Sequence, residues 1–318
     1  MISRRLLRIK ALMALYAMNR REDGNLVSAE KELMFSIEKT YDLYHYLLQL
    51  ILELSDIAGD KIDQALQKRI PTPEDLNPNR RFVDNKVIQQ LRNNEDFRHY
   101  IDTRKLSWVN SHIPRLLYTK LIKWDEYRDY MSPATSTYTD DKKFIIKIIT
   151  SLFLQSEDLG FFLEEQSIYW NDDIEYVSAM IEKTLRKFKT DSKTDAPLMP
   201  LFKNEEDEEF VKVLFRKAVM NQPKFSQLID RNTTNWEVER IALMDILVMQ
   251  LAITEITEFS EVPVRVSLNE YIEIAKYYCT SKSSTFVNGI LDKIVKEMRD
   301  SGELRKSGRG LVGEDLSD

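Results

Sequence analysis

Apolar residues recur at helical spacing from the start of the chain. On a helix that we predict from Ser3 to about Asn19, four apolar side chains share one side: Leu6, Ile9, Met13 and Ala17. Side chains three and four positions apart lie on one face of an α-helix, so this side can be buried. Ser3 belongs to the residue types favoured at an N-cap. Arg4 and Arg8 fall on another side, which we expect to face solvent.

The same spacing predicts helices over most of the remaining chain. They are expected at residues 28–54, at 81–130 with a break near Pro114, from about 140, and from about 206. Gly59 is predicted to end the second helical region, because Gly and Pro are the strongest interruptions of a helix. Residues 71–78 and Ser132-Pro133 are predicted loops, and residues 190–209 a linker with two prolines and an acidic cluster.

A helix predicted over residues 236–256 is apolar nearly all round. From Ile241 to Ile253 only Asp245 and Gln250 are polar. Such a helix lies in the centre of a bundle. Its two polar side chains must then be hydrogen-bonded or lie at an edge, because unpaired buried polar groups are costly.

The segment 262–294 contains two further helical patterns. Ser267 is predicted to cap the first, with Glu270 three residues later as in a capping box. Phe286 opens the second, which includes Asn288 and Gly289. A Gly within a helix costs about 1 kcal/mol relative to Ala, so Gly289 needs a packing or contact reason.

Composition favours a soluble, helical protein. The chain has 318 residues, of which 43% are hydrophobic, 31% are charged and only 8 are Gly. No run approaches the roughly 20 apolar residues that span a bilayer, and no secretory cleavage pattern follows the basic start. Cys279 is the only cysteine, which fits a reducing cytoplasm. We therefore expect an all-α, cytoplasmic protein without a membrane partner.

Catalytic and metal-binding patterns are missing from the sequence. His45, His99 and His112 are widely separated, and no Cys-x-x-Cys or Glu-x-x-His spacing occurs. Phosphate-binding loops, dinucleotide fingerprints and nucleophile motifs are absent as well. Cys279 is best read as a small buried residue. We expect no enzyme activity, no cofactor and no metal.

The distribution of charge points to nucleic acid. The net charge is −6, yet residues 1–21 contain six Lys or Arg and no acid. Arginine binds phosphates with its planar fork and stacks on unpaired bases. A local basic arm on an acidic protein can therefore supply RNA contacts, although a basic run is more often only a solvated face.

Two segments resemble the NusB family of bacterial antitermination factors. Residues 210–295 are similar to the C-terminal region of the family, most specifically over 262–294. Ser3–Met18, reading SRRLLRIKALMALYAM, is similar to its arginine-rich first helix. The resemblance implies a small helical domain that binds boxA-type RNA together with a small-subunit ribosomal protein, called NusE in this role. The complex would join the RNA polymerase elongation complex and suppress termination on ribosomal RNA operons.

The resemblance also implies site residues. The RNA-binding set is Arg4, Arg5, Arg8, Tyr16, Lys282, Phe286 and Asn288. Asp245 and Glu255 are expected to face the protein partner. Tyr16 and Phe286 would offer stacking faces for bases. The alternative for each aromatic is a place in the core, which is common for aromatics at helical spacing.

The family is usually about half this length, so we predict a NusB-like bundle with a large helical insertion. The expected parts are the first helix at 1–21, the insertion at 22–200, the C-terminal domain at 201–300 and a disordered tail at 301–318. A rival function is a protein-interaction scaffold in ribosome assembly that lacks RNA affinity. A second rival, the RNA-binding module of a methyltransferase, is disfavoured because no nucleotide-cofactor domain is attached.

Overall fold

Helices are the only regular secondary structure in the described part of the chain, which confirms the predicted all-α fold. The computed structural model describes residues 1–21, 24–133, 135, 137–192, 196–233 and 241–312. The chain divides into two units. Unit 1 contains Met1 and Glu38–Leu201, and unit 2 contains Ile2–Ile37 and Phe202–Asp318. No helix within the described residues is long and apolar enough to cross a membrane.

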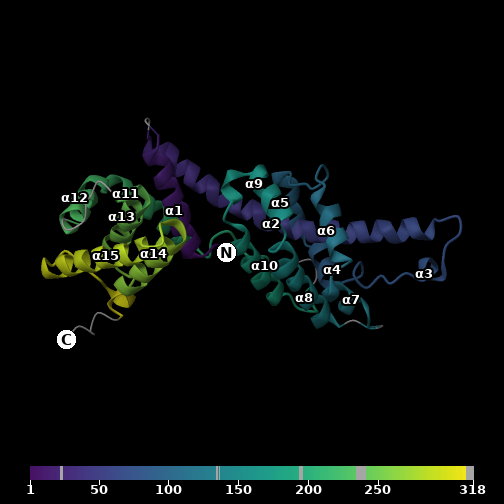
Figure 1. The fold of residues 1–318 in the computed structure, drawn as a ribbon. Coiled ribbons are helices and arrows are strands. Elements are labelled where there is room, and N and C mark those ends of the chain that lie inside the picture. Colours follow the sequence, from purple (N-terminus) through teal and green to yellow (C-terminus); the bar gives the residue numbers. More distant parts are fainter. Residues whose placement is uncertain (22–23, 134, 136, 193–195, 234–240, 313–318) are drawn as a thin grey trace. The chain divides into compact units, whose positions relative to one another are not determined.

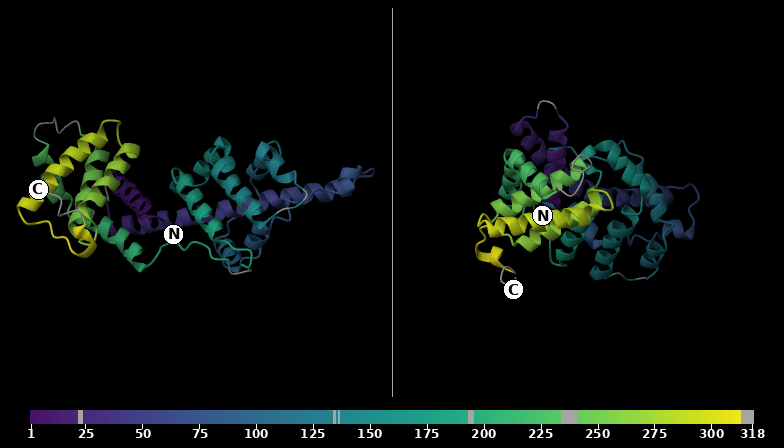
Figure 2. Two further views of the ribbon diagram at one scale, coloured as in Figure 1. Left: turned by 90° about the horizontal axis from the view of Figure 1, so that it is seen from below. Right: turned by 60° about the vertical axis from the view of Figure 1, so that its left-hand side comes forward.

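Unit 2 joins the start of the chain to its last third. Figure 1 shows α1 beside α11 and α13, which follow it only after most of the chain. Both views in Figure 2 also show α1 against the helices of this unit. The elements are α1 (Arg4–Asn19), the first part of α2 (Leu26–Leu66), α11 (Glu205–Met220), α12 (Gln222–Asn232), α13 (Leu243–Glu258), α14 (Val264–Tyr278), α15 (Ser283–Asp300) and a 3₁₀ turn, η4 (Gly308–Leu311).

The central helix of unit 2 is α13. It packs against α1, α11, α12, α14 and α15, and all residues from Leu247 to Ile256 are buried. This confirms the central place predicted from its apolar pattern. Gln250 Nε2 donates to Ser226 Oγ at 3.0 Å, whereas its buried Oε1 has no hydrogen-bond partner among the described residues. Residues 236–240 of the predicted helix lie outside the described residues.

Helix α1 begins where its sequence predicts, and it buries Leu6 and Ile9 of the predicted side together with residues on other sides. Ser3 Oγ accepts a hydrogen bond from the Leu6 amide at 3.2 Å, as expected for an N-cap. The buried stripe includes Arg8, Leu12 and Leu15, three residues at i, i+4 and i+7. Arg8 therefore lies on the packed side, and the expectation that it faces solvent was wrong.

The capping box predicted at Ser267 does not exist. Helix α14 begins one turn earlier, with Pro263 at its N-cap, so Ser267 lies inside the helix. Its hydroxyl donates to Glu255 Oε1 of α13 at 2.8 Å. The spacing of Ser267 and Glu270 reflects two separate contacts to other helices, because Glu270 binds Arg5 of α1.

Unit 1 is built on the second part of α2. Its other elements are α3 (Pro73–Leu76), α4 (Lys86–Arg92), α5 (Glu95–Arg104), α6 (Ile113–Leu121), α7 (Asp125–Met131), α8 (Tyr138–Lys147), a π-helical segment η1 (Ile148–Phe153), α9 (Glu157–Gln166), a 3₁₀ turn η2 (Ile168–Trp170) and α10 (Ile174–Lys187). Gly59 does not end α2, contrary to prediction. A single Gly costs only about 1 kcal/mol in a helix, which the packing of a long helix outweighs.

Aromatic side chains of α2 form much of the core of unit 1. The His45 ring stacks on Tyr100 with ring centroids 3.8 Å apart, and Tyr46 stacks on Trp108 at 3.9 Å. Burial lowers the pKa of His45 to about 4, so the ring is neutral at pH 7. Tyr41 Oη donates to the Met199 carbonyl at 2.8 Å. Met199, near the end of this unit, therefore lies against α2, the helix with which the unit begins.

The end of the chain is more ordered than its composition suggests. Lys306 Nζ donates to the Phe259 carbonyl at 3.0 Å, and Ser307 Oγ bonds Ser260 Oγ at 3.0 Å. Gly310 lies so close to the Ser260 carbonyl that a Cβ there would clash. Disorder was predicted from Ser301 onward, whereas residues 301–312 have defined positions; residues 313–318 lie outside the described part.

Candidate functional site

The three arginines of α1 are all bound to carboxylates of later helices. Arg4 Nε donates to Asp207 of α11 at 2.8 Å. Arg5 makes two bonds of 2.8 Å to Glu270 of α14. Arg8 makes two bonds of 2.7 Å to Glu255 of α13. These pairs fix α1 to three helices of unit 2, and they neutralise the charge that the sequence offered for RNA.

The pair of Arg8 and Glu255 lies in the core. Their side chains are 5% and 0% exposed. Ser267 Oγ and Tyr271 Oη also donate to Glu255, at 2.8 and 3.0 Å. Burial raises the pKa of Tyr271 well above its ordinary value, so this hydroxyl remains a donor. The carboxylate is thus fully bonded, as a buried charge must be.

This burial argues against two expected roles. Arg8 has no free surface to offer a phosphate, and Glu255 has none to offer a protein partner. We therefore assign both residues to the stability of unit 2. Asp245 is also buried, and its Oδ2 accepts a bond from Ser283 Oγ at 2.9 Å. This bond joins the start of α13 to the start of α15.

Arg4 and Arg5 remain partly exposed, at 40% and 42% of their side chains. Hydrogen bonds from Arg5 hold the pKa of Glu270 below its ordinary value, so the carboxylate stays charged at neutral pH. An RNA phosphate at this point must compete with the resident carboxylates.

A second group of expected RNA-binding residues lies at the start of α15. Lys282 is exposed at the N-cap, and Phe286 and Asn288 are half-buried. Asn288 Nδ2 donates to Asp292 at 3.1 Å. Gly289 is exposed, and a Cβ added there would meet nothing within 4 Å. Packing within the described chain thus gives no reason for a Gly at position 289.

The two groups lie toward opposite ends of α13. Asp245 holds the start of α15 at one end, and Glu255 holds Arg8 near the other. Ten residues of α-helix span about 15 Å. A strand of several nucleotides can reach over such a length.

Tyr16 lies two turns beyond Arg8 on α1 and is half-buried. The Arg20 guanidinium sits 5.3 Å from the centre of its ring, so one face of the ring is covered. The sequence included Arg20 in the basic arm but not in the site. Its position beside an expected stacking residue makes it a better candidate for RNA contact than the buried Arg8.

Arg4 also borders an acidic groove of about 510 Å³ in unit 2. The groove floor is apolar, with Phe210, Val213, Phe259 and Val262. Its rim carries five glutamates: Glu205, Glu206, Glu209, Glu258 and Glu261. Such a surface repels phosphates and attracts basic groups. The sequence did not reveal this groove, because its residues come from three separate segments.

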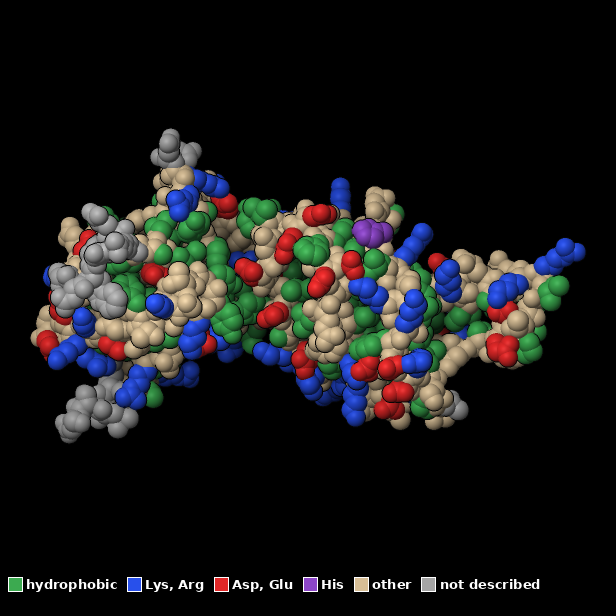
Figure 3. Space-filling view, viewed as in Figure 1, with side chains coloured by type: hydrophobic (Ala, Val, Ile, Leu, Met, Phe, Trp, Pro, Cys, Tyr) green, Lys and Arg blue, Asp and Glu red, His purple; other side chains and the backbone are tan. Residues whose placement is uncertain are grey.

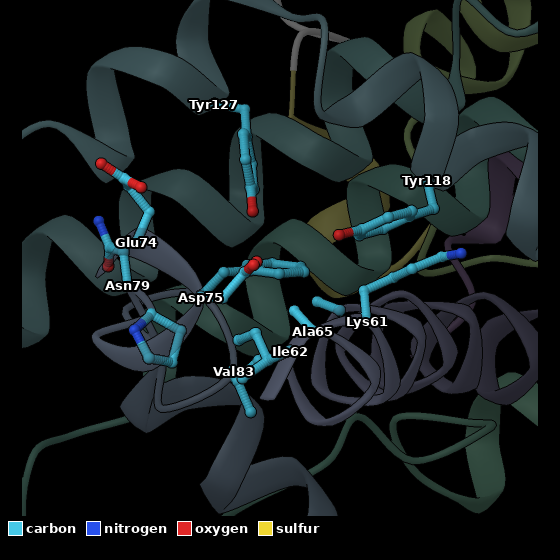
Figure 4. Close-up of a pocket in the computed structure, with 12 residues that line it drawn as sticks. Lys61, Ile62, Ala65, Glu74, Asp75, Asn79, Val83, Tyr118 and Tyr127 are labelled. Carbon is cyan, nitrogen blue, oxygen red and sulfur yellow. The ribbon is translucent and has the colours of Figure 1, made fainter. Parts of the chain in front are cut away.

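Unit 1 has a smaller hollow of about 310 Å³ between α2, α6 and α7. Figure 4 shows the hydroxyls of Tyr118 and Tyr127 turned toward its interior, where Asp75 also lies. Burial raises the pKa of both tyrosines, so these hydroxyls stay protonated. No group of three or more His, Cys, Asp or Glu residues in the described ranges is placed to hold a metal ion.

Comparison with known proteins gives a consistent result. The NusB family model matches residues 169–296. The transcription antitermination protein NusB of Salinibacter ruber is 42% identical over 117 residues, which is 37% of this chain and 73% of that protein. The NusB protein of Chloroherpeton thalassium is 44% identical over 104 residues, 33% of this chain and 49% of that protein. That of Natranaerobius thermophilus is 33% identical over 95 residues, 30% of this chain and 68% of that protein.

No solved structure matches the chain. The family match runs from the end of unit 1, where it includes α10, through α11 to α14 and most of α15, and it does not include α1. Helix α1 is joined to the matched helices by packing and by its three ion pairs. From the identity and coverage of these relatives, the chain belongs to the NusB family.

Proposed function

We propose that this protein is a transcription antitermination factor that binds boxA-like single-stranded RNA together with a small-subunit ribosomal protein in the role of NusE. In this proposal the complex joins the RNA polymerase elongation complex and promotes transcription of ribosomal RNA operons. Family membership supports it, since the relatives above are named transcription antitermination proteins. The observation that carries it is the exposed start of α15, where Gly289 has no packing partner within the described residues.

The start of α15 suits single-stranded RNA. Lys282 offers a charge to phosphate, and Asn288 offers an amide to a base edge. Gly289 lets a ligand approach the helix backbone closely. Phe286 supplies a half-buried ring. From here a strand can extend toward the partly exposed Arg5, where it competes with Glu270.

The acidic groove suits the protein partner. A ribosomal protein that binds RNA is basic, and the five rim glutamates complement that charge. The apolar floor adds the surface that an interface core needs. This groove takes the place of Asp245 and Glu255, which are buried, as the proposed partner surface.

The test is a titration of labelled boxA-like and scrambled RNA, with and without the partner. A double variant, Lys282→Gln with Asn288→Ala, should weaken boxA-like binding about tenfold, the loss of one or two polar contacts. Lys293→Gln is the matched control, because Lys293 is exposed on the same helix without an ion pair in the described residues. Equal affinity of the double variant and the control would refute the proposed RNA surface.

The alternative function is a scaffold in ribosome assembly without RNA affinity. Neutralisation of Arg4, Arg5 and Arg8 by carboxylates is the observation that favours it. The same titration decides between the two functions. Absence of RNA binding even with the partner present would establish the scaffold, provided that the protein still binds the ribosomal protein.

A further inference from the structure

The second halves of α8 and α10 are rich in Lys and Arg. Residues 142–147 and 183–189 contain seven Lys or Arg and no Asp or Glu. They are Lys142, Lys143, Lys147, Lys183, Arg186, Lys187 and Lys189. We name this surface of unit 1 the α8–α10 basic face. It stands out because the whole chain has a net charge of −6.

Packing places the two basic segments together. Helices α8 and α10 are in contact. Lys142 Nζ donates to the carbonyls of Phe188 at 2.8 Å and Arg186 at 3.4 Å, where α10 ends. This bond satisfies carbonyls that a helix end leaves unpaired. Figure 3 shows Lys and Arg side chains gathered along the part of the surface over these two helices.

Few of these cations are neutralised. Lys147 pairs with Glu126 of α7 at 3.0 Å, and Arg186 pairs with Glu182 at 2.5 Å. The other exposed members, Lys143, Lys183, Lys187 and Lys189, make no ion pair within the described residues. Lys183 and Lys187 are like charges at i, i+4, an arrangement that costs a helix about 0.2–0.5 kcal/mol. No acidic side chain in the described residues forms an ion pair with either lysine to offset this repulsion.

The face lacks the exposed apolar side chains that enter a membrane and the free aromatic rings that stack on bases. Among the described residues, none of the exposed large apolar side chains lies on α8 or α10, so no such group is available to enter a membrane. Tyr138, at the start of α8, is covered by the Lys142 ammonium at 5.3 Å and bonds Gln90 through its hydroxyl. Phe144 and Phe188, which lie within the two basic segments, are buried. These rings are therefore not free to stack on bases, and the chemistry of the face fits a sugar-phosphate backbone and no particular sequence.

We propose that the α8–α10 basic face binds the phosphate backbone of RNA without reading its bases. It gives the protein a second RNA contact on unit 1, separate from the start of α15. The inference rests on the proposed function in that RNA is the anionic polymer this protein meets. Unit 1 then raises affinity for any RNA, while unit 2 selects the sequence.

The test compares two triple variants of the full chain. The first is Lys143→Gln, Lys183→Gln and Lys187→Gln. The matched control is Lys61→Gln, Lys105→Gln and Lys123→Gln, three lysines that are also exposed on unit 1 and unpaired within the described residues. Both variants lose three charges, so any difference between them reports position and not net charge.

A uridine homopolymer is titrated over a series of salt concentrations. Each phosphate contact contributes about 0.7 to the slope of log affinity against log salt for single strands. The first variant should therefore lower the slope by about 2, and the control should leave it unchanged. Equal slopes for the first variant and the natural protein would overturn the inference, and so would an equal fall in the control. Loss of binding to anionic vesicles with no change in RNA binding would assign the face to membranes instead.

The same titrations separate this inference from the proposed function. The ratio of affinities for boxA-like and scrambled RNA reports unit 2 and should not change in the first variant. A natural protein that shows no such preference refutes the proposed function, whatever the slope. A preserved preference with an unchanged slope refutes only the α8–α10 basic face.

Discussion

Replacing Arg8 with Met should strongly destabilise unit 2. In the variant the buried Glu255 keeps only Ser267 and Tyr271 as donors, and its charge has no counter-ion. Removal of one partner from a buried ion pair costs about 3–5 kcal/mol. A domain of this kind is stable by about 5–15 kcal/mol, so the variant should fold but with a large loss. Glu255→Gln should show a similar loss, because it leaves Arg8 charged in the core with only the longer contact of 3.6 Å to Glu270.

The double variant distinguishes a buried pair from two independent residues. Simple addition of the single losses gives about 6–10 kcal/mol. Combining Arg8→Met with Glu255→Gln removes both charges and leaves no unpaired ion, so the loss should stay below about 5 kcal/mol. The difference is the coupling free energy of the pair. A coupling of at least about 1 kcal/mol is expected for residues in direct contact.

Urea unfolding can follow the two units separately. Trp108, Trp124 and Trp170 all belong to unit 1, so tryptophan fluorescence reports that unit in a Trp236→Phe background. Far-UV circular dichroism reports the helices of both units. Arg8→Met should lower the urea midpoint of one dichroism transition and leave the fluorescence midpoint in place. Arg20→Met is the control, since this exposed arginine should cost less than about 0.5 kcal/mol.

Two results would refute this reasoning. Arg8→Met could cost no more than Arg20→Met, which would mean that Arg8 is not buried against a carboxylate. Alternatively, the double variant could lose the full sum of the single losses. Additivity would show that Arg8 and Glu255 do not interact in the folded protein.

Three further predictions follow from individual contacts. Lowering the pH from 7 to about 4 should destabilise unit 1 by about 3 kcal/mol through His45, because its folded pKa of about 4 lies below the ordinary 6.5 and the unfolded chain takes the proton first. The fluorescence midpoint in urea should fall over this range, and an equal fall in His45→Phe would contradict the assignment. Gly289→Ala should raise the thermal midpoint of unit 2 by an amount that reflects about 0.5–1 kcal/mol, because the Cβ meets open space, and it should weaken RNA binding; unchanged affinity would count against close contact at α15. Arg5→Ala should cost less than about 1 kcal/mol at pH 7, because its pair is half-exposed, and nothing once the pH falls below the lowered pKa of Glu270; a larger loss in urea unfolding, or one that persists in acid, would refute this.

Local signals predicted the elements whose causes are local. Ser3 identified the start of α1, because an N-cap depends only on the next few residues. The apolar run of α13 identified the centre of unit 2, because the pattern that marks a buried helix also lies within one short stretch of sequence. Gly59 misled, because its local cost is smaller than the packing of α2, which sequence alone does not show. Ser267 misled because a Ser three residues before a Glu fits both a capping box and two contacts to neighbouring helices.

The candidate site was less predictable because its partners are distant in the sequence. Arg8 and Glu255 are 247 positions apart, so nothing near Arg8 reveals that its charge is taken. The same holds for Arg4 and Arg5, whose carboxylates come from α11 and α14. Gly289 gave a local signal that remained valid, since a helical Gly without packing partners in the described chain still requires an explanation. The acidic groove gave no signal, because it exists only once three segments meet.

Native-state hydrogen exchange over a series of urea concentrations tests most directly whether α1 belongs to the same folded unit as the closing helices. The amides of α1 from Leu7 to Leu15 should open together with those of α13, with the same free energy and the same dependence on urea. If the amides of α1 instead open with those of α4 to α10, or exchange without protection while α13 stays closed, then the two remote segments do not form one unit.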